Sequence, residues 1–270
     1  MLPVFWKMLS KRAKKLNINN MNITALKTNR IDSDNPPNLL SILQRYLQSF
    51  KEQSILAITS KIVAICEGRV IKIGQIDKLD LIHKEAEFYL RPDHQYHISL
   101  TIKNNLLVPT AGIDESNGNG YYILWPKNPQ KTANTVRSYL QNRFNLHKVG
   151  VVITDSKTTP LRWGTTGTAL AHSGFAPLNN YIGTKDIFGR KLKVTYANIM
   201  DALAAGAVLV MGEGNEQTPL AVIQDVPFVK FQNRNPTNKE LNNLKIDLKD
   251  DLYGSLLTSV PWKKGKIPEV

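Results

Sequence analysis

The stretch Val149-Gly150-Val151-Val152-Ile153-Thr154-Asp155-Ser156 decides how this chain folds. Residues 149–154 are almost entirely apolar and mostly β-branched, a composition typical of a short strand buried inside a sheet. The apolar run stops at an acid, so we expect the strand to surface at Asp155. Ser156 follows directly and adds a hydroxyl beside that carboxylate.

Two further apolar runs end at an acid in the same way. Residues 111–114 end at Asp114, and residues 208–213 end at Glu213. We expect these two carboxylates and Asp155 to converge at one rim of the core. Carboxylates grouped at such a rim are usual ligands for Mg²⁺ or Mn²⁺ carrying a nucleotide phosphate.

Polar residues beside the three acids suit the same chemistry. Ser156 can add a hydroxyl ligand, and Asn117 can donate or accept hydrogen bonds toward a base or a phosphate. The glycines of Gly212-Glu213-Gly214-Asn215 allow backbone N–H groups to approach an anion closely. A single acid at a strand end more often forms a turn than binds a ligand. The hypothesis of phosphate chemistry therefore rests on these residues taken together and not on any one of them.

Outward from this centre, strands and helices alternate, and the hairpin-like turns predict an α+β fold with mixed, largely antiparallel sheets flanked by helices. Apolar spacing predicts helices over residues 39–50, 131–145 and 197–211, the second with Arg137 and Arg143 on its exposed face and the third buried and closing at Gly212. The expected strands cover residues 22–26, 54–64 with a second half that can turn helical, 69–76, 121–125 and 219–223, with a hairpin over 98–108.

The chain divides into three parts. Residues 1–20 hold five Lys or Arg and no acid, and we interpret them as a basic N-terminal extension outside the fold, with a membrane-touching helix as the alternative. Residues 21–228 form the central region. Residues 229–270 are rich in Asn and Lys and predict a polar C-terminal arm with one helical stretch over 239–248.

The charge and hydropathy of the chain limit the kinds of molecule that we expect it to bind. The net charge of +13 would suit nucleic acid, anionic lipid or polyphosphate, but the middle of the chain has no polybasic block. We therefore expect small anionic substrates and no nucleic acid. No apolar run approaches the roughly 20 residues of a membrane helix, which argues against stable membrane insertion. The lone Cys66 fits a reducing, cytoplasmic setting, where it would be a buried packing residue.

Several common enzyme motifs are missing from the sequence. It contains no Walker A sequence, no G-x-G-x-x-G after a strand, no H-E-x-x-H and no G-x-S-x-G elbow. His94 and His97 have a spacing that could bind a metal, although such a pair more often lies in a solvated loop. Ordinary hydrolase and dehydrogenase functions are therefore disfavoured.

Six blocks of sequence resemble the coenzyme F420-0 gamma-glutamyl ligase family, which includes a branch associated with folate metabolism. They occur in the expected order between about residue 23 and residue 228. The blocks are Thr59-Ser60-Lys61 with Glu67-Gly68-Arg69, Ala111-Gly112-Ile113-Asp114 with Ser116-Asn117, Val151 to Asp155, Gly164-x-x-Gly167 with Ala169, Gly183 with Asp186-x-Phe188-Gly189-Arg190, and Met211-Gly212-Glu213-Gly214.

The resemblance implies a ligase that uses GTP, or ATP, to join L-glutamate to an anionic, carboxylate-bearing acceptor through an acyl phosphate. It implies two divalent ions, Mn²⁺ or Mg²⁺, with Asp114 and Asp155 binding one while Ser156 and Glu213 help to hold the other. It also implies a homodimer whose chains intertwine.

Nucleotide-binding residues follow from the same blocks. The resemblance assigns contacts to Ser60, Lys61 and Asn117, and Lys27-Thr28-Asn29-Arg30 falls at the family's first nucleotide loop, where the match is poor. Arg162 and Arg190 are candidate catalytic residues that grip phosphate or carboxylate, with structural ion pairing as the alternative. The remaining nucleotide contacts would come from Met211, Gly212, Gly214, Asn215, Glu216, Gln217 and Thr218.

One departure from the family leaves alternatives open. Ile65 stands where family members have a lysine that would meet a phosphate, and Lys61 could replace it if the segment is helical. The acceptor could be a deazaflavin or a folate-type molecule. The chain could also be a non-catalytic nucleotide- or polyanion-binding protein, or a metal-dependent phosphohydrolase in which water replaces the amine.

Overall fold

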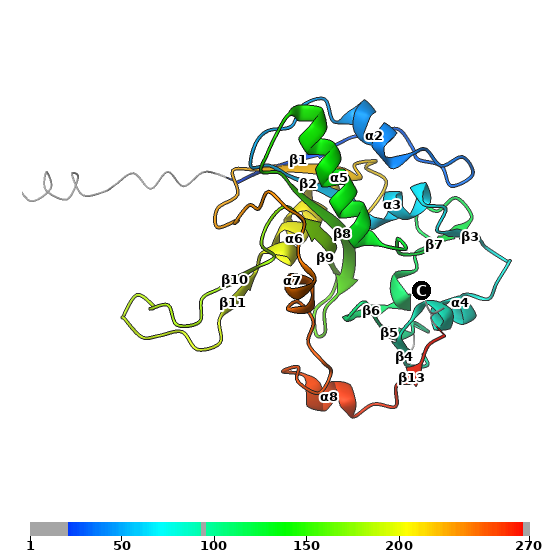
Figure 1. The fold of residues 1–270 in the computed structure, drawn as a ribbon. Coiled ribbons are helices and arrows are strands. Elements are labelled where there is room, and N and C mark those ends of the chain that lie inside the picture. The colour runs from blue at the N-terminus through cyan, green and yellow to red at the C-terminus, as the bar shows by residue number, and fades with distance from the viewer. Residues whose placement is uncertain (1–20, 93–95, 267–270) are drawn as a thin grey trace, which may run out of the picture.

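A five-stranded sheet with helices on both faces forms the larger part of the molecule (Figure 1). The structure is a computed structural model that describes residues 21–92 and 96–266. The expected N-terminal extension and His94 lie outside the described residues. The helices in those ranges are all too short or too polar to cross a membrane.

The two parallel strands of this sheet are buried along most of their paired length. β2 and β8 run parallel, from the pair Ile55 and Gly150 to the pair Thr59 and Thr154, and all other neighbours are antiparallel. The mixed, largely antiparallel sheet confirms the predicted fold class. In spatial order the strands are β1 (Asn22–Leu26), β12 (Leu220–Gln224), β2 (Ile55–Thr59), β8 (Gly150–Thr158) and β9 (Thr165–Ser173).

Successive side chains of β2 point to opposite faces of the sheet and so contribute to a hydrophobic core on each face. Leu56 and Ile58 pack with three helices on one face, whereas Ile55 and Ala57 pack against a single helix on the other. All four side chains are fully buried. The helices of the first face are α2 (Leu39–Tyr46), α3 (Ser60–Cys66) and α5 (Pro129–Phe144), and the helix of the second is α6 (Ile199–Met211).

A smaller lobe lies beside this sheet. Its four-stranded sheet contains the hairpin predicted over residues 98–108, and Asn104 and Asn105 both adopt the left-handed conformation that its tight turn requires. The lobe consists of β13 (Lys263–Lys264), β4 (Phe88–Tyr89), β5 (Leu100–Lys103) and β6 (Leu106–Pro109) in that order, with α4 (Lys78–Glu85), the short helix η1 (Thr110–Gly112) and the pair β3 (Val70–Lys72) and β7 (Tyr121–Ile123).

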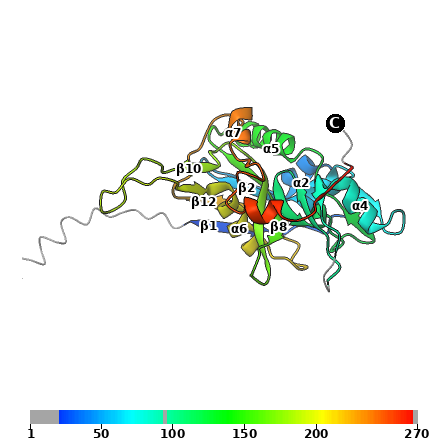
Figure 2. The ribbon, with the colours of Figure 1, turned by 90° about the horizontal axis from the view of Figure 1, so that it is seen from below.

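Two extensions leave this body, and both views show the first one projecting far from it (Figures 1 and 2). This projecting arm consists of β10 (Leu178–Asn180), β11 (Tyr196–Asn198) and the loop of residues 181–195 between them. The second extension carries α7 (Asn238–Asn242) and α8 (Gly254–Thr258) and ends by adding β13 to the edge of the four-stranded sheet.

Several elements differ in extent from the prediction. The helix predicted over 39–50 ends at Tyr46, because Leu47 already has non-helical backbone angles, and Leu47 and Phe50 are buried outside the helix. The strand predicted over 69–76 covers only β3, and the helix predicted over 239–248 covers only α7, which begins at a capping box and ends among asparagines. Tyr196–Asn198, at the start of the predicted third helix, forms β11 instead.

The predicted burial was wrong for two residues and for one face of a helix. Arg137, expected on the exposed face of α5, is 6% exposed and donates to Asn235 and Gln141, so polar partners compensate its burial. Cys66 is half-buried at the end of α3 rather than buried. The helix expected to be buried before Gly212 has one open face, where Leu209 is 84% exposed.

Candidate active site

A pocket of about 450 Å³ opens where β2 gives way to α3. Because β2 and β8 are parallel, their ends meet at the same edge of the sheet, and loops from both sides close around that edge. The lining comes from segments 28–31, 59–65, 117–123, 154–156 and 208–219. Four of these segments, 59–65, 117–123, 154–156 and 208–219, contain residues of the blocks that the sequence singled out.

Asp155 lies inside β8 and not at its end, because the strand continues to Thr158 beyond the last residue of β2. A bulge between Ile153 and Thr154 shifts the register just before it. The carboxylate accepts a hydrogen bond from the indole Nε1 of Trp125 and is also hydrogen-bonded with Ser60 and the backbone of Ser156. Burial raises the pKa of Asp155 to about 6, against the opposing effect of these hydrogen bonds.

Lys61 connects Asp114 to the pocket. Its Nζ lies 2.7 Å from Asp114 Oδ2 and donates to Ser116 Oγ over 2.8 Å. Burial opposes ionisation of Asp114, but the Lys61 ammonium and the hydrogen bonds from Ser116 hold the pKa of that carboxyl below its usual range. Since α3 is helical from Ser60, Lys61 does lie one turn before Ile65, and both residues line the pocket.

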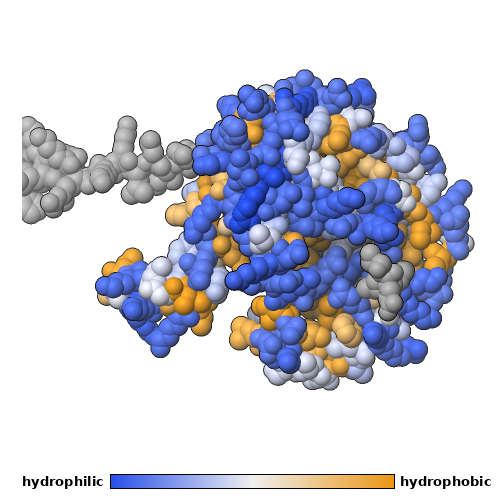
Figure 3. All heavy atoms as spheres, viewed as in Figure 1, coloured by the Kyte–Doolittle hydropathy of each residue, from blue (hydrophilic) through white to orange (hydrophobic). Residues whose placement is uncertain are grey.

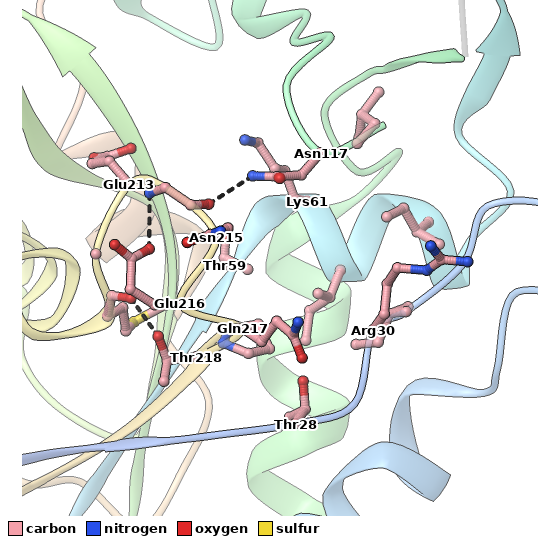
Figure 4. A pocket seen from close by; sticks show the side chains of 18 of the residues that line it. Thr28, Arg30, Thr59, Lys61, Asn117, Glu213, Asn215, Glu216, Gln217 and Thr218 are labelled. Atoms are coloured by element: carbon pink, nitrogen blue, oxygen red, sulfur yellow. Dashed lines mark hydrogen bonds between the residues drawn. The ribbon is translucent and has the colours of Figure 1, made fainter. Parts of the chain in front are cut away.

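The loop after α6 forms one wall of the pocket (Figure 4). Gly214 N donates to Glu216 Oε2 over 2.8 Å, so an internal carboxylate accepts an N–H that we expected to meet a phosphate. Gly212 has a φ of 80°, and a Cβ at this position would lie 2.5 Å from the Glu216 carboxyl carbon. The loop therefore binds its own glutamate through the backbone N–H of Gly214, and the absence of a side chain at Gly212 leaves room for that carboxylate.

Contacts from two distant segments fix this loop. Asn117 donates from Nδ2 to Gly214 O over 2.8 Å, and Thr28 N donates to Gln217 O over 2.8 Å. Segments separated by about 100 and 190 residues in the sequence thus meet at residues 212–218. The contact from Thr28 places residues 28–31 in the pocket wall, although the sequence match there was poor.

Polarity changes from one end of the pocket to the other. In Figure 4, Glu213 and Glu216 lie at one end and Arg30 at the opposite end, with Lys61 and Asn117 between them. The buried Ile65 adds an apolar wall. An elongated ligand with charged and apolar parts would match this gradient.

The oxygen donors suit Mg²⁺ or Mn²⁺ by type, but they are not assembled. Asp155, Ser156 and Glu213 line the pocket, whereas Asp114 is held by Lys61. Within residues 21–92 and 96–266, no three Asp, Glu, His or Cys side chains form a group that could hold a metal ion. Asp155 and Glu213 thus line one pocket, as expected. The third acid, Asp114, pairs with the Lys61 ammonium instead.

The two arginines proposed as catalytic are not brought to the pocket. Arg162 lies in the exposed turn between β8 and β9, and Arg190 lies in the projecting arm, where its N–H donates to Asp186 Oδ1. Neither residue lines the pocket within one chain. Their proposed grip on phosphate or carboxylate stays a prediction.

One contact of the site was missed in the sequence. Trp125 was expected only as the end of a strand, yet its buried indole contacts Asp155 from a segment 30 residues away. No local pattern in the sequence indicates such a contact, because it depends on how the smaller lobe packs against β8.

Comparison with known proteins is consistent with these blocks. The family model described as F420-0:Gamma-glutamyl ligase matches residues 26–225. A protein of Methanococcus maripaludis named Coenzyme F420:L-glutamate ligase is 32% identical over 238 residues, which cover 82% of this chain and 93% of the relative. A protein of the same name from Methanocaldococcus jannaschii is 32% identical over 210 residues, covering 71% of this chain and 83% of the relative. The chain belongs to the F420-0:gamma-glutamyl ligase family.

Proposed function

We propose that this protein is a nucleotide-driven ligase that forms an amide between L-glutamate and a carboxylate of an F420-type acceptor. The observation that carries the proposal is the pocket itself, where residues 59–65, Asn117 and residues 211–218 line one cavity. The relatives are named for L-glutamate ligation to coenzyme F420, which favours a deazaflavin over a folate-type acceptor.

The proposed reaction has two steps. The acceptor carboxylate attacks the terminal phosphate of a nucleoside triphosphate, forming an acyl phosphate and releasing the diphosphate. The amine of glutamate then attacks the acyl carbon, and the products are the amide, inorganic phosphate and a proton. Both steps gather negative charge, so they need cationic groups in the pocket.

Lys61 is the residue best placed to meet a phosphate. Ile65, one turn further along α3, offers only an apolar surface, whereas Lys61 lines the pocket beside Asn117. Nucleotide binding at Gly214 would also require Glu216 to release that N–H. We propose GTP as the nucleotide, with ATP as the alternative.

Asp155, Glu213 and Ser156 would hold a divalent cation, and Asp114 would join them once Lys61 turns to phosphate. Their hard oxygen donors match Mg²⁺ or Mn²⁺, and the family resemblance implies two ions. A bound cation would supply charge stabilisation to the phosphoryl group. Lys61 and the loop at 212–218 would orient the nucleotide beside it.

An assay of phosphate release tests the reaction. The protein is incubated with GTP or ATP, Mn²⁺, glutamate and either a deazaflavin or a folate-type acceptor. Release that requires both glutamate and the deazaflavin is the expected result. Release without them would indicate a phosphohydrolase, and nucleotide binding without release would indicate a non-catalytic binding protein.

We also propose that the protein is a homodimer, as the resemblance implies. The projecting arm carries large apolar side chains that the chain itself leaves open, and Figure 3 shows them as orange spheres on that arm. Ile187 is 92% exposed and Phe188 is 89% exposed. Exposed apolar surface concentrated on an extension is typical of an interface, and a second copy would cover it.

Light scattering after gel filtration tests the dimer. The double change Ile187→Ser with Phe188→Ser should weaken self-association by about 100-fold or more, since each buried apolar side chain contributes about 1.5–3 kcal/mol. Leu252→Ser, which alters an equally exposed leucine on the C-terminal extension, is the matched control. A wild-type protein that is monomeric at micromolar concentration would refute this proposal.

A further inference from the structure

Trp125 contacts the candidate site without lining it. Trp125 is 2% exposed, and its indole Nε1 donates to Oδ2 of Asp155, a carboxylate that lines the pocket. A buried N–H donated to a carboxylate is a charge-assisted hydrogen bond, which is stronger and more directional than one between neutral groups. The orientation of Asp155 therefore depends on the position of this ring.

The ring itself is fixed on one side by a glycine. A Cβ added at Gly112 would lie 2.0 Å from the indole Nε1, so that any side chain there would displace the ring. Gly112 belongs to the block that leads to Asp114, and η1 holds it in a left-handed conformation with a φ of 72°. The absence of a side chain at Gly112 is therefore what lets the indole pack in this position.

A partly buried ion network also contacts the residue. Lys103 Nζ lies 5.5 Å from the centre of the Trp125 ring, and Arg69 Nε donates to the Trp125 carbonyl over 3.2 Å. Both cations pair with Glu85 at 2.7 Å. Such a network resists movement because displacing one member leaves buried charges unpaired.

We propose that Trp125 is a positioning residue that orients the Asp155 carboxylate for a divalent cation. This inference rests on the proposed function, because it takes Asp155 as a ligand. Hydrogen bonds to metal-binding side chains from outside the site commonly set ligand orientation, and their loss costs about 10- to 100-fold in metal affinity. Glu85, Lys103 and Arg69 of the smaller lobe would thereby support a ligand that β8 of the larger sheet carries.

The test removes the N–H and keeps an aromatic ring. Mn²⁺ binding to Trp125→Phe, measured by the electron paramagnetic resonance of free Mn²⁺, should be about tenfold weaker than binding to the wild type. The control is Trp262→Phe, which removes an indole N–H that donates to Leu257 O on the C-terminal extension. It should bind Mn²⁺ like the wild type.

Kinetics separate positioning from a general loss of structure. In Trp125→Phe, the Mn²⁺ concentration that gives half-maximal activity should rise by about tenfold, while turnover at saturating Mn²⁺ stays within about twofold of the wild type. A variant that is merely less stable would lose active protein at every Mn²⁺ concentration. Equal Mn²⁺ affinity in a folded Trp125→Phe and the wild type would overturn the inference.

A measurement on the unaltered protein applies if Trp125→Phe does not fold. With ¹⁵N-labelled tryptophan, the indole N–H resonance of Trp125 should shift during a Mg²⁺ titration and saturate together with binding, whereas that of Trp262 should not. A Trp125 resonance that ignores bound Mg²⁺ would refute its role. A wild type that binds neither Mg²⁺ nor Mn²⁺, with or without nucleotide, would instead refute the proposed function, and the role of Trp125 with it.

Discussion

The five-stranded sheet and the projecting arm use apolar residues in opposite ways. In the sheet, Leu56 and Ile58 are fully buried by helices of the same chain. On the arm, Ile187 and Phe188 are among the most exposed large apolar residues described. The sheet therefore buries its apolar side chains within its own chain, whereas the arm leaves its own exposed, as expected of the interface proposed above.

The largest expected effect concerns the sheet. Asp155→Asn keeps the size of the side chain but removes the charge, and we expect turnover to fall by about 1,000-fold, since charge stabilisation of a phosphoryl group contributes several kcal/mol. Glutamate- and acceptor-dependent phosphate release measures this loss. Asp250→Asn, on an exposed acid of the C-terminal extension, is the matched control, and full activity of Asp155→Asn would show that the catalytic site lies elsewhere.

Truncation of one apolar side chain in each region compares the two directly. Leu43→Ala should lower the free energy of unfolding by about 3 kcal/mol at any protein concentration, because Leu43 is fully buried in the core of α2 and the sheet. Phe188→Ala should lower it only at concentrations where the wild type is dimeric. Urea denaturation at two protein concentrations measures both, and a concentration-independent loss in Phe188→Ala would mean that the arm packs within its own chain.

A smaller effect involves a buried histidine on β9. His172 is fully buried, and neither ring nitrogen has a hydrogen-bond partner among the described residues. Burial lowers the pKa of His172 to about 4. The unfolded chain takes up a proton near pH 6.5 and the folded chain does not, so the free energy of unfolding should fall by about 2 kcal/mol between pH 7 and pH 5 because of this residue.

Urea denaturation across this pH range measures the contribution of His172. His172→Leu cannot take up the proton, so its stability should change less with pH than that of the wild type. His147→Leu, which alters an exposed histidine in the turn before β8, is the matched control. Parallel stability curves for the wild type and His172→Leu would show that the imidazole is protonated in the folded sheet.

The smallest expected effect is at the pocket itself. Lys61→Met removes the cation that pairs with Asp114, so Mn²⁺ affinity without nucleotide should rise about two- to fivefold, in line with about 0.5–1 kcal/mol for a partly exposed pair. Nucleotide affinity should fall in the same variant. Calorimetric titration measures both, with Lys72→Met on β3 as the control, and an unchanged nucleotide affinity would remove Lys61 from the phosphate site.

The sequence predicted the central part of the fold well because its pattern is local. Residues 149–154 are apolar at every position but one glycine and one threonine, and β8 covers most of this stretch. The parallel pairing of β2 with β8 brings Ser60, just after β2, to Asp155 of β8. Long-range packing was harder to predict, which is why the contact of Trp125 and the burial of Arg137 were missed.

The site was predicted in composition but not in arrangement. Local sequence located Asp114, Asp155 and Glu213 at the ends of apolar runs, but it could not indicate that Lys61 pairs with the first of them or that Glu216 accepts the N–H of Gly214. Both contacts occupy, within the chain, groups that we expect to meet a phosphate or a cation. They depend on side-chain positions that no spacing in the sequence determines.

Crystals soaked with Mn²⁺ and GTP would locate the cation by its anomalous scattering. A peak within bonding distance of Asp155 and Glu213, with the nucleotide phosphates between Lys61 and the loop at 212–218, is the result we predict. An empty pocket, or a peak bound only by residues outside it, would contradict the assignment of this pocket as the catalytic site.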